Sequence, residues 1–166
     1  MFLGVSVLRR LPQTIPFGFP AACFACLLAT ALTAHAVLGG NIASVQADQV
    51  HMQGSVRMSS ASNYTVQEIQ GSGGIVVREY VSHSGKVFGV AWQGSWPPDL
   101  RQLLGNYFDQ YEQAVKAQRV TRVGRGPLLI NQPGLVVEMR GHPRSFFGRA
   151  YVPGMLPAGT HAEDIQ

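Results

Sequence analysis

The sequence predicts an α+β fold: an antiparallel sheet of about six strands in the order βββ-α-βββ, with one long amphipathic helix packed on one face. Two groups of three β-forming runs are separated by short glycine turns, and turns this short join antiparallel strands. Between the groups, apolar residues recur every three or four positions, as in a helix that buries one side. The 166 residues include 19 Gly and 10 Pro and only 13% charged residues, which fits one turn-rich domain and excludes a coiled coil.

The first group of strands follows a region of weak pattern. Its three runs cover residues 64–69, 75–81 and 87–92, and each is rich in β-branched and aromatic residues. The glycine-containing turns at 71–74 and 82–85 connect them. We therefore expect a meander of three antiparallel strands.

The helix is expected to begin at Leu100. Prolines and Asp99 precede it, and an acid there faces the positive end of the helix dipole. The apolar stripe runs to Val115, and glycines at 124 and 126 end the pattern. Gly105 lies inside the expected helix, where glycine costs about 1 kcal/mol relative to alanine.

The second group of strands covers residues 128–131, 135–140 and 145–151. Turns containing proline and glycine separate the runs, so these strands are also expected to pair antiparallel. Residues 156–166 are expected to form a loop that ends in a helical turn.

Residues 1–36 have the pattern of a secretory signal peptide. Arg9 and Arg10 precede an uncharged apolar run at 21–34, and an Ala-His-Ala cleavage site ends at Ala36. The apolar run is short for a membrane span, although an uncleaved anchor is the alternative. We expect a flexible lead at 37–61, with a short strand near 42–45, and a single α+β domain at 62–166.

Cleavage near Ala36 would change the chemistry of the chain. Both cysteines, Cys23 and Cys26, lie in the apolar run, so the mature chain has no thiol and no disulfide. No later segment approaches the roughly 20 apolar residues of a membrane span, so we expect no transmembrane span in the mature chain. The expected location is the periplasm or the medium.

Segments along most of the chain carry a resemblance: residues 38–40, 74–82, 85–92, 98–108, 134–138, 141–142 with Arg144, and 148–153. Together they resemble a family of small exported proteins of Gram-negative bacteria that is catalogued only as a domain of unknown function. The resemblance covers nearly the whole mature chain. It implies export and a single domain, and it carries no activity, cofactor or catalytic residue.

Motifs for common enzymes are missing from the sequence. No histidine pair has zinc-ligand spacing, no G-x-S-x-G elbow is present, and no glycine-rich loop precedes a helix. We therefore expect neither a metal nor a cofactor. His142, in a turn beside Arg144, is the best single histidine for binding an anion, and the alternative is a solvated turn residue.

Two carboxylates are candidates for a buried pair. Alternation places Glu79 on the same strand face as Val77 and Val81, where a buried carboxylate is costly unless it is paired or protonated. Glu68, in the preceding strand, is expected to lie nearby. Two such acids could hydrolyse glycosidic bonds. The alternatives are an ion pair from Glu79 to Arg140 or Arg149, or a position near water.

Basic residues concentrate in one part of the chain. Residues 116–149 contain seven bases and one acid, which indicates a surface that faces anions. Trp96 is a further candidate, because an exposed tryptophan pair with Trp92 could bind a carbohydrate or a partner. The candidate binding residues are Arg119, Arg122, Arg125, Arg140, His142, Arg144, Arg149 and Trp96.

Three functions are compatible with these patterns. We favour a non-catalytic module of the cell envelope that binds an envelope protein, a polysaccharide or an anionic lipid, and we expect no nucleic acid as a partner. An envelope hydrolase that uses Glu68 and Glu79, or His142, is the alternative. A third possibility is a structural component that assembles through an exposed sheet edge.

Overall fold

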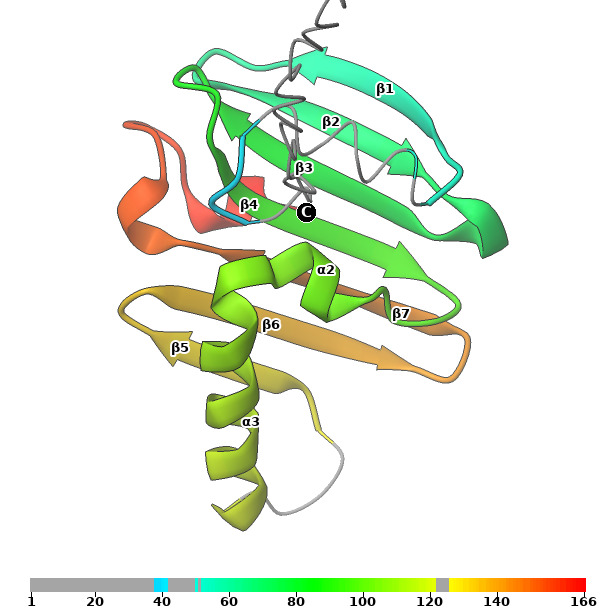
Figure 1. Cartoon of the computed structure of the whole chain (residues 1–166), viewed down its shortest axis with the longest axis vertical. Coiled ribbons are helices and arrows are strands. Elements are labelled where there is room, and N and C mark those ends of the chain that lie inside the picture. The colour runs from blue at the N-terminus through cyan, green and yellow to red at the C-terminus, as the bar shows by residue number, and fades with distance from the viewer. Residues whose placement is uncertain (1–37, 42–49, 51, 122–125) are drawn as a thin grey trace, which may run out of the picture. The chain divides into compact units, whose positions relative to one another are not determined.

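Seven strands form one sheet in the order β1-β2-β3-β4-β7-β6-β5 (Figure 1). The structure is a computed structural model that describes residues 38–41, 50, 52–121 and 126–166. All neighbouring strands in it pair antiparallel, as expected. The strands are β1 (Ser55–Ser60), β2 (Tyr64–Gln70), β3 (Val76–Ser82), β4 (Val87–Gly94), β5 (Leu128–Gln132), β6 (Leu135–His142) and β7 (Ser145–Tyr151).

The expected order of six strands was wrong by one strand. Four strands precede the helices and three follow them, because β1 lies inside the segment 37–61 that we expected to be a flexible lead. Most side chains of β1 are exposed, so the strand carries no alternating pattern, and its backbone pairs with β2 at the edge of the sheet. The strand expected near 42–45 lies outside the described residues.

The helical region begins as expected and is interrupted once. Helix α2 (Leu100–Leu104) is capped by the Asp99 carboxylate, which accepts hydrogen bonds from the backbone N–H groups of Arg101 and Gln102 at 2.9 and 3.2 Å. A short 3-10 turn, η2 (Gly105–Tyr107), then leads into α3 (Phe108–Thr121). The break falls at Gly105, which we expected to lie inside one continuous helix.

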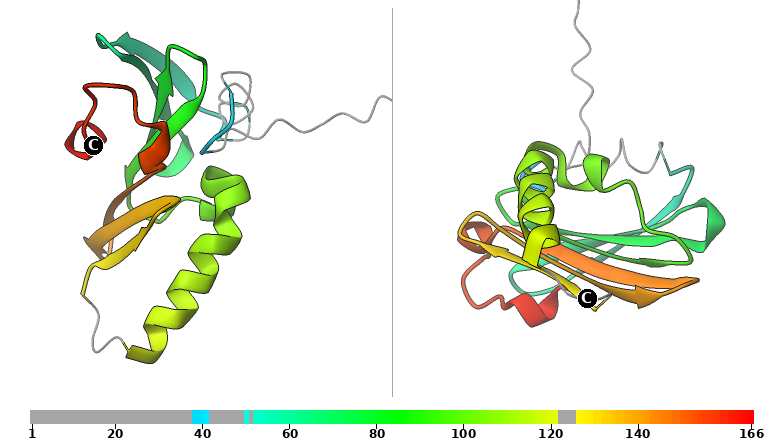
Figure 2. Two further views of the ribbon diagram at one scale, coloured as in Figure 1. Left: turned by 90° about the vertical axis from the view of Figure 1, so that its left-hand side faces the viewer. Right: turned by 90° about the horizontal axis from the view of Figure 1, so that it is seen from below.

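The helices cover one face of the sheet (Figure 2). Their apolar stripe packs on the side chains that alternate toward this face, so a buried core forms between the helices and the sheet. Tyr111 also donates to the Met139 sulfur at 3.7 Å, and Gln110 donates to the Gln132 amide oxygen at 2.8 Å. Members of this core are Ile69, Val77, Val81, Val90, Trp92, Leu103, Leu104, Ala114, Ile130, Leu135 and Val137.

Residues 38–41 form part of the same core. Leu38 is buried, and its backbone N–H donates to the Leu103 carbonyl at 3.0 Å. Backbone bonds also join Gly39 and Gly40 to Val87, at 2.8 and 3.1 Å. This segment therefore ties α2 to the start of β4.

The chain after β7 crosses to the opposite face of the sheet (Figure 2). It contains two short 3-10 turns, η3 (Pro153–Met155) and η4 (Ala162–Asp164). Ile165 at its end is fully buried in a second, smaller apolar cluster with Tyr80, Phe88 and Ala91. The two faces of the sheet thus have different covers: helices on one, and the C-terminal segment on part of the other.

Candidate functional site

One row of side chains crosses all seven strands on the face opposite α3. Residues directly opposite each other on neighbouring strands point to the same side of a sheet. The observed register therefore aligns two acid–arginine pairs symmetrically about Ala91 of the central strand β4. In order, the row is Arg57, Glu68, Arg78, Ala91, Arg149, Glu138 and Leu129.

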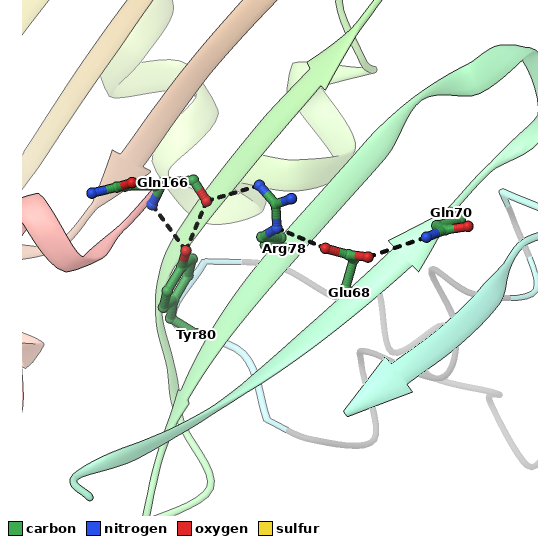
Figure 3. A network of polar contacts seen from close by, with 5 residues as sticks. All are labelled: Glu68, Gln70, Arg78, Tyr80 and Gln166. Atoms are coloured by element: carbon green, nitrogen blue, oxygen red, sulfur yellow. Dashed lines mark hydrogen bonds and ion pairs between the residues drawn. The ribbon is translucent and has the colours of Figure 1, made fainter. Parts of the chain in front are cut away.

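The two arginines of the row are each held by a carboxylate from the next strand outward. Arg78 Nε lies 2.8 Å from Glu68 Oε2, and Arg149 Nη2 lies 3.1 Å from Glu138 Oε1. Gln70 also donates to Glu68 Oε1 at 3.2 Å (Figure 3). The hydrogen bonds from Gln70 and Arg78 lower the pKa of Glu68 below its ordinary value of 4.5, so this carboxylate is charged near neutral pH.

The inner N–H groups of both arginines bind the backbone of the C-terminal segment. Arg149 Nη1 donates to the carbonyl oxygens of Ala162 and Ile165, at 2.6 and 3.4 Å. Arg78 Nη1 donates to the carbonyl oxygen of Gln166 at 3.1 Å (Figure 3). The two arginines of the row therefore bind main-chain oxygens of the C-terminal segment, which lies over the centre of the row.

Tyr80 holds the same segment from the neighbouring position on β3. Its hydroxyl donates to the Gln166 carbonyl at 2.8 Å and accepts from the Gln166 N–H at 2.9 Å (Figure 3). The residue is 3% exposed, and burial raises the pKa of Tyr80 above its ordinary value of 10.0. Tyr80 is therefore neutral near pH 7 and able to donate and accept at once.

Beside the C-terminal segment, the same face is hollowed into a groove of about 490 Å³. Three arginines and Glu138 contribute to its lining, with Ile165 and Gln166 from the C-terminal segment. A second row of side chains, Arg140, Phe147 and Gln93 on β6, β7 and β4, also lines it. Because neighbouring strands are about 4.8 Å apart, this second row spans roughly 10 Å.

Arg140 is the cation of the groove that is available to a ligand. Within the described part of the chain its guanidinium makes no ion pair, whereas Arg78 and Arg149 both do. Phe147, its partner across the strands, is 49% exposed. The groove thus presents a guanidinium, an aromatic ring and the Gln93 amide side by side.

The predicted binding residues are only partly brought together. Arg140 and Arg149 line the groove, whereas Arg119 lies at the end of α3, which packs on the other face. His142 and Arg144 are exposed in the β6–β7 turn region. Arg122 and Arg125 lie outside the described residues.

The two tryptophans do not form an exposed pair. Trp92 is buried in the core on the helix side, although part of it also contributes to the groove lining. Trp96 is 74% exposed in the loop after β4. The β4–α2 loop and the β6–β7 turn lie at the same end of the sheet, because Gly94 pairs with Phe146.

The predicted carboxylate pair is not formed. Glu79 is fully buried on the helix side with Val77 and Val81, as the alternation indicated. Its partner across β2 is Gln67, and Glu68 is one residue further, on the opposite face. The expectation that Glu68 lies near Glu79 was therefore wrong, and Arg149, one of the partners considered for Glu79, pairs with Glu138 instead.

Sequence reasoning did not select Arg78, Tyr80, Gln93 or Phe147 as site residues. Alternation had placed Arg78 and Tyr80 together on one strand face, which was the available signal. Their relation to β7 and to Gln166 depends on the pairing of β4 with β7 and on the path of the C-terminal segment. Neither follows from a local pattern.

Two further properties of the described residues bear on function. No group of three or more His, Cys, Asp and Glu side chains in this part of the chain could hold a metal ion. No helix in it is long and apolar enough to cross a membrane.

Comparison with known proteins gives a match to a family model. The model, described as a protein of unknown function, matches residues 34–165. Neither a curated protein nor a solved structure matches the chain. The matched range includes every residue of the two rows and of the C-terminal segment except Gln166.

Proposed function

Since the chain belongs to the DUF2844 family of proteins of unknown function, we propose a function from the site itself: an exported, non-catalytic binding module of the cell envelope that holds anionic groups on the helix-free face of its sheet. Family membership confirms the resemblance drawn from the sequence. The Gram-negative origin and the export remain predictions that rest on that resemblance and on residues 1–36.

The observation that carries this proposal is the Arg140 guanidinium in an open groove. Arginine binds carboxylate and phosphate oxygens with paired N–H donors, and such charge-assisted bonds are about twice as strong as neutral ones. Arg78 and Arg149 line the same groove, and Glu138 is the acidic residue in its lining. The lining is therefore cationic. These features support an anionic ligand over a neutral one.

The neighbours of Arg140 favour a ligand whose anionic group is attached to a larger polar molecule. Phe147 offers an exposed ring, and Gln93 offers both an amide donor and an acceptor. A carboxylate or phosphate attached to a sugar ring or a lipid headgroup presents the matching chemistry. Acidic polysaccharide and anionic lipid share this chemistry, and separate binding assays distinguish them.

The test replaces Arg140 with serine. We expect Arg140→Ser to weaken retention of the purified protein on isolated envelopes roughly 10- to 100-fold, because a hydrogen-bonded charge contributes about 1.5–3 kcal/mol. Cosedimentation at several protein concentrations measures the effect. Binding to polygalacturonate and to vesicles containing phosphatidylglycerol then shows which source of anion is used.

Arg119→Ser is the matched control, because it removes an exposed arginine of the same basic region from α3. We expect its retention to equal that of the unaltered protein. Equal retention of Arg140→Ser and the unaltered protein would contradict the groove as the contact. Loss of retention in Arg119→Ser alone would assign binding to the helix.

A further inference from the structure

The guanidinium groups of Arg78 and Arg149 converge on one short stretch of backbone. Their N–H groups bind main-chain oxygens of Gln166 and Ile165, which are consecutive residues. Consecutive Cα atoms are about 3.8 Å apart, so both guanidiniums reach the same small space above Ala91. Ala91 lies between the two arginines in the row, and Ile165 of the C-terminal segment packs in the same buried cluster as Ala91.

Both guanidiniums are also held in place from the outside. Glu68 and Glu138 bind them on the sides that face away from Ala91. Each arginine therefore keeps donors directed inward at little further cost in side-chain entropy. Two fixed guanidiniums that share one space form a typical arrangement for a carboxylate or phosphate group.

At Arg149 the present partners are neutral main-chain carbonyls, those of Ala162 and Ile165. Arg78 binds the main-chain oxygen of Gln166. We name residues 161–166 the C-terminal clasp. A peptide carbonyl is a weaker partner for a guanidinium than an anionic oxygen is. The clasp also depends on contacts that an anion would not replace: the burial of Ile165 and the two hydrogen bonds from Tyr80.

We propose that Arg78 and Arg149 form a second, latent anion subsite that the C-terminal clasp closes, and that an anionic ligand in the groove opens it by displacing residues 165 and 166. The inference deepens the proposed function, because it assumes a ligand with carboxylate or phosphate groups. The groove that contains Arg140 is adjacent, since Ile165 and Gln166 line it. A ligand with two anionic groups can therefore bind Arg140 first and the latent subsite second.

Displacement makes clasp release and anion binding reciprocal. A ligand that binds the open form more tightly shifts the clasp toward release, and a loosened clasp raises the apparent affinity by the same factor. The first measurement is amide hydrogen exchange of the unaltered protein with and without polygalacturonate. We expect faster exchange at Ile165 and Gln166, whose N–H groups bind Ala162 and Tyr80, when the polymer is added.

We expect Gly89→Ala, on strand β4 beneath Ile165, to loosen the clasp. A Cβ atom at Gly89 would lie 2.8 Å from Ile165 Cδ1, so the end of that side chain must move. Tyr80→Phe loosens it independently by removing both hydrogen bonds to Gln166 and keeping the ring. We expect each variant to exchange faster at residues 165–166 and to bind polygalacturonate roughly fivefold more tightly or better.

Gly154→Ala is the matched control, because it adds a methyl group to open space in the same C-terminal region. It should behave as the unaltered protein. Adding Arg149→Gln to Gly89→Ala should remove the gain in affinity, which ties the gain to the latent subsite.

The proposal of a latent subsite is wrong if the variants loosen the clasp without any gain in affinity, or if polygalacturonate binds without changing amide exchange at residues 165–166. Absence of anion binding in every variant would instead overturn the proposed function.

Discussion

At the scale of single residues, the acid–arginine pairs position side chains more than they stabilise the fold. The side chains of Arg78 and Glu68 are 31% and 22% exposed, and ion pairs this close to water typically contribute about 0–1 kcal/mol. Their geometric effect is larger. Each carboxylate fixes a long, flexible side chain so that its remaining donors meet the C-terminal clasp.

Glu68 gives the protein a measurable response to acid. Its lowered folded-state pKa means that its contribution to stability is present above the ordinary value of 4.5 and is lost as the pH falls through the folded-state pKa. We expect Glu68→Gln to be slightly less stable near pH 7 and to lose less stability than the unaltered protein below pH 4.5. Urea denaturation across pH 3–7 measures this difference.

The control for this prediction is Glu163→Gln, because Glu163 is exposed and its carboxylate makes no ion pair with another described residue. Its acid response should match that of the unaltered protein. If Glu68→Gln and the unaltered protein lose stability in parallel below pH 4.5, the ion pair with Arg78 does not persist in solution.

Residue-level alternation predicted which side chains share a strand face, and it did not predict which neighbouring strand residues join them. It correctly placed Glu79 with Val77 and Val81. The error on Glu68 arose because a change of register by one residue moves every side chain of a strand to the other face. The 3-10 turn η1 (Ser72–Gly74) sets that register, and its glycine-rich sequence does not specify it.

At the scale of elements, Gly105 separates two helices that the apolar stripe had suggested were one. Its φ and ψ are 45° and −115°, a conformation that only glycine adopts readily. The helical periodicity continues on both sides of the break, so the sequence pattern predicted the extent of the helical region and missed its interruption.

This conformation predicts the effect of a substitution at Gly105. An uninterrupted helix would be stabilised by Gly105→Ala, whereas the observed geometry makes the variant less stable by about 1–3 kcal/mol. Thermal or urea unfolding measures the sign. Gly126→Ala, at a glycine with open space around it and no positive φ, should lie within about 1 kcal/mol of the unaltered protein.

Strand β1 shows the other limit of element prediction. Each of the six strands that follow it contains at least one buried side chain, but β1 buries none. It exists because its backbone pairs with β2 from Ser55 to Ser60. Backbone pairing with a neighbouring strand does not require a pattern in the local sequence, so such a strand is not predictable from that sequence.

At the scale of the whole fold, the pairing of β4 with β7 determines the site. Hairpin pairs are predictable from short turns, but this pair joins segments more than fifty residues apart. It brings Arg149 next to Ala91 and Phe147 next to Gln93. The candidate site therefore depends on a long-range strand contact that no local sequence pattern predicts.

Leu38 provides a test of how the sheet, α2 and the N-terminal side of the fold are joined. The side chain is 1% exposed and packs in the main core. We expect Leu38→Ala to reduce the free energy of unfolding by about 2–5 kcal/mol, as for other buried leucines. Urea denaturation measures this free energy.

The exposed Met58 is the control, and Met58→Ala should change stability by less than about 0.5 kcal/mol. A similarly small effect at Leu38 would show that residues 38–41 do not dock in solution.

The docking of Leu38 has a consequence for the cleavage that the sequence predicts between Ala36 and Val37. That bond would lie two residues before a side chain that the fold encloses. A peptidase needs the chain accessible and locally unfolded around the bond it cuts. Cleavage at the predicted bond would therefore have to precede the docking of residues 38–41, and a chain that folded first would keep residues 1–36.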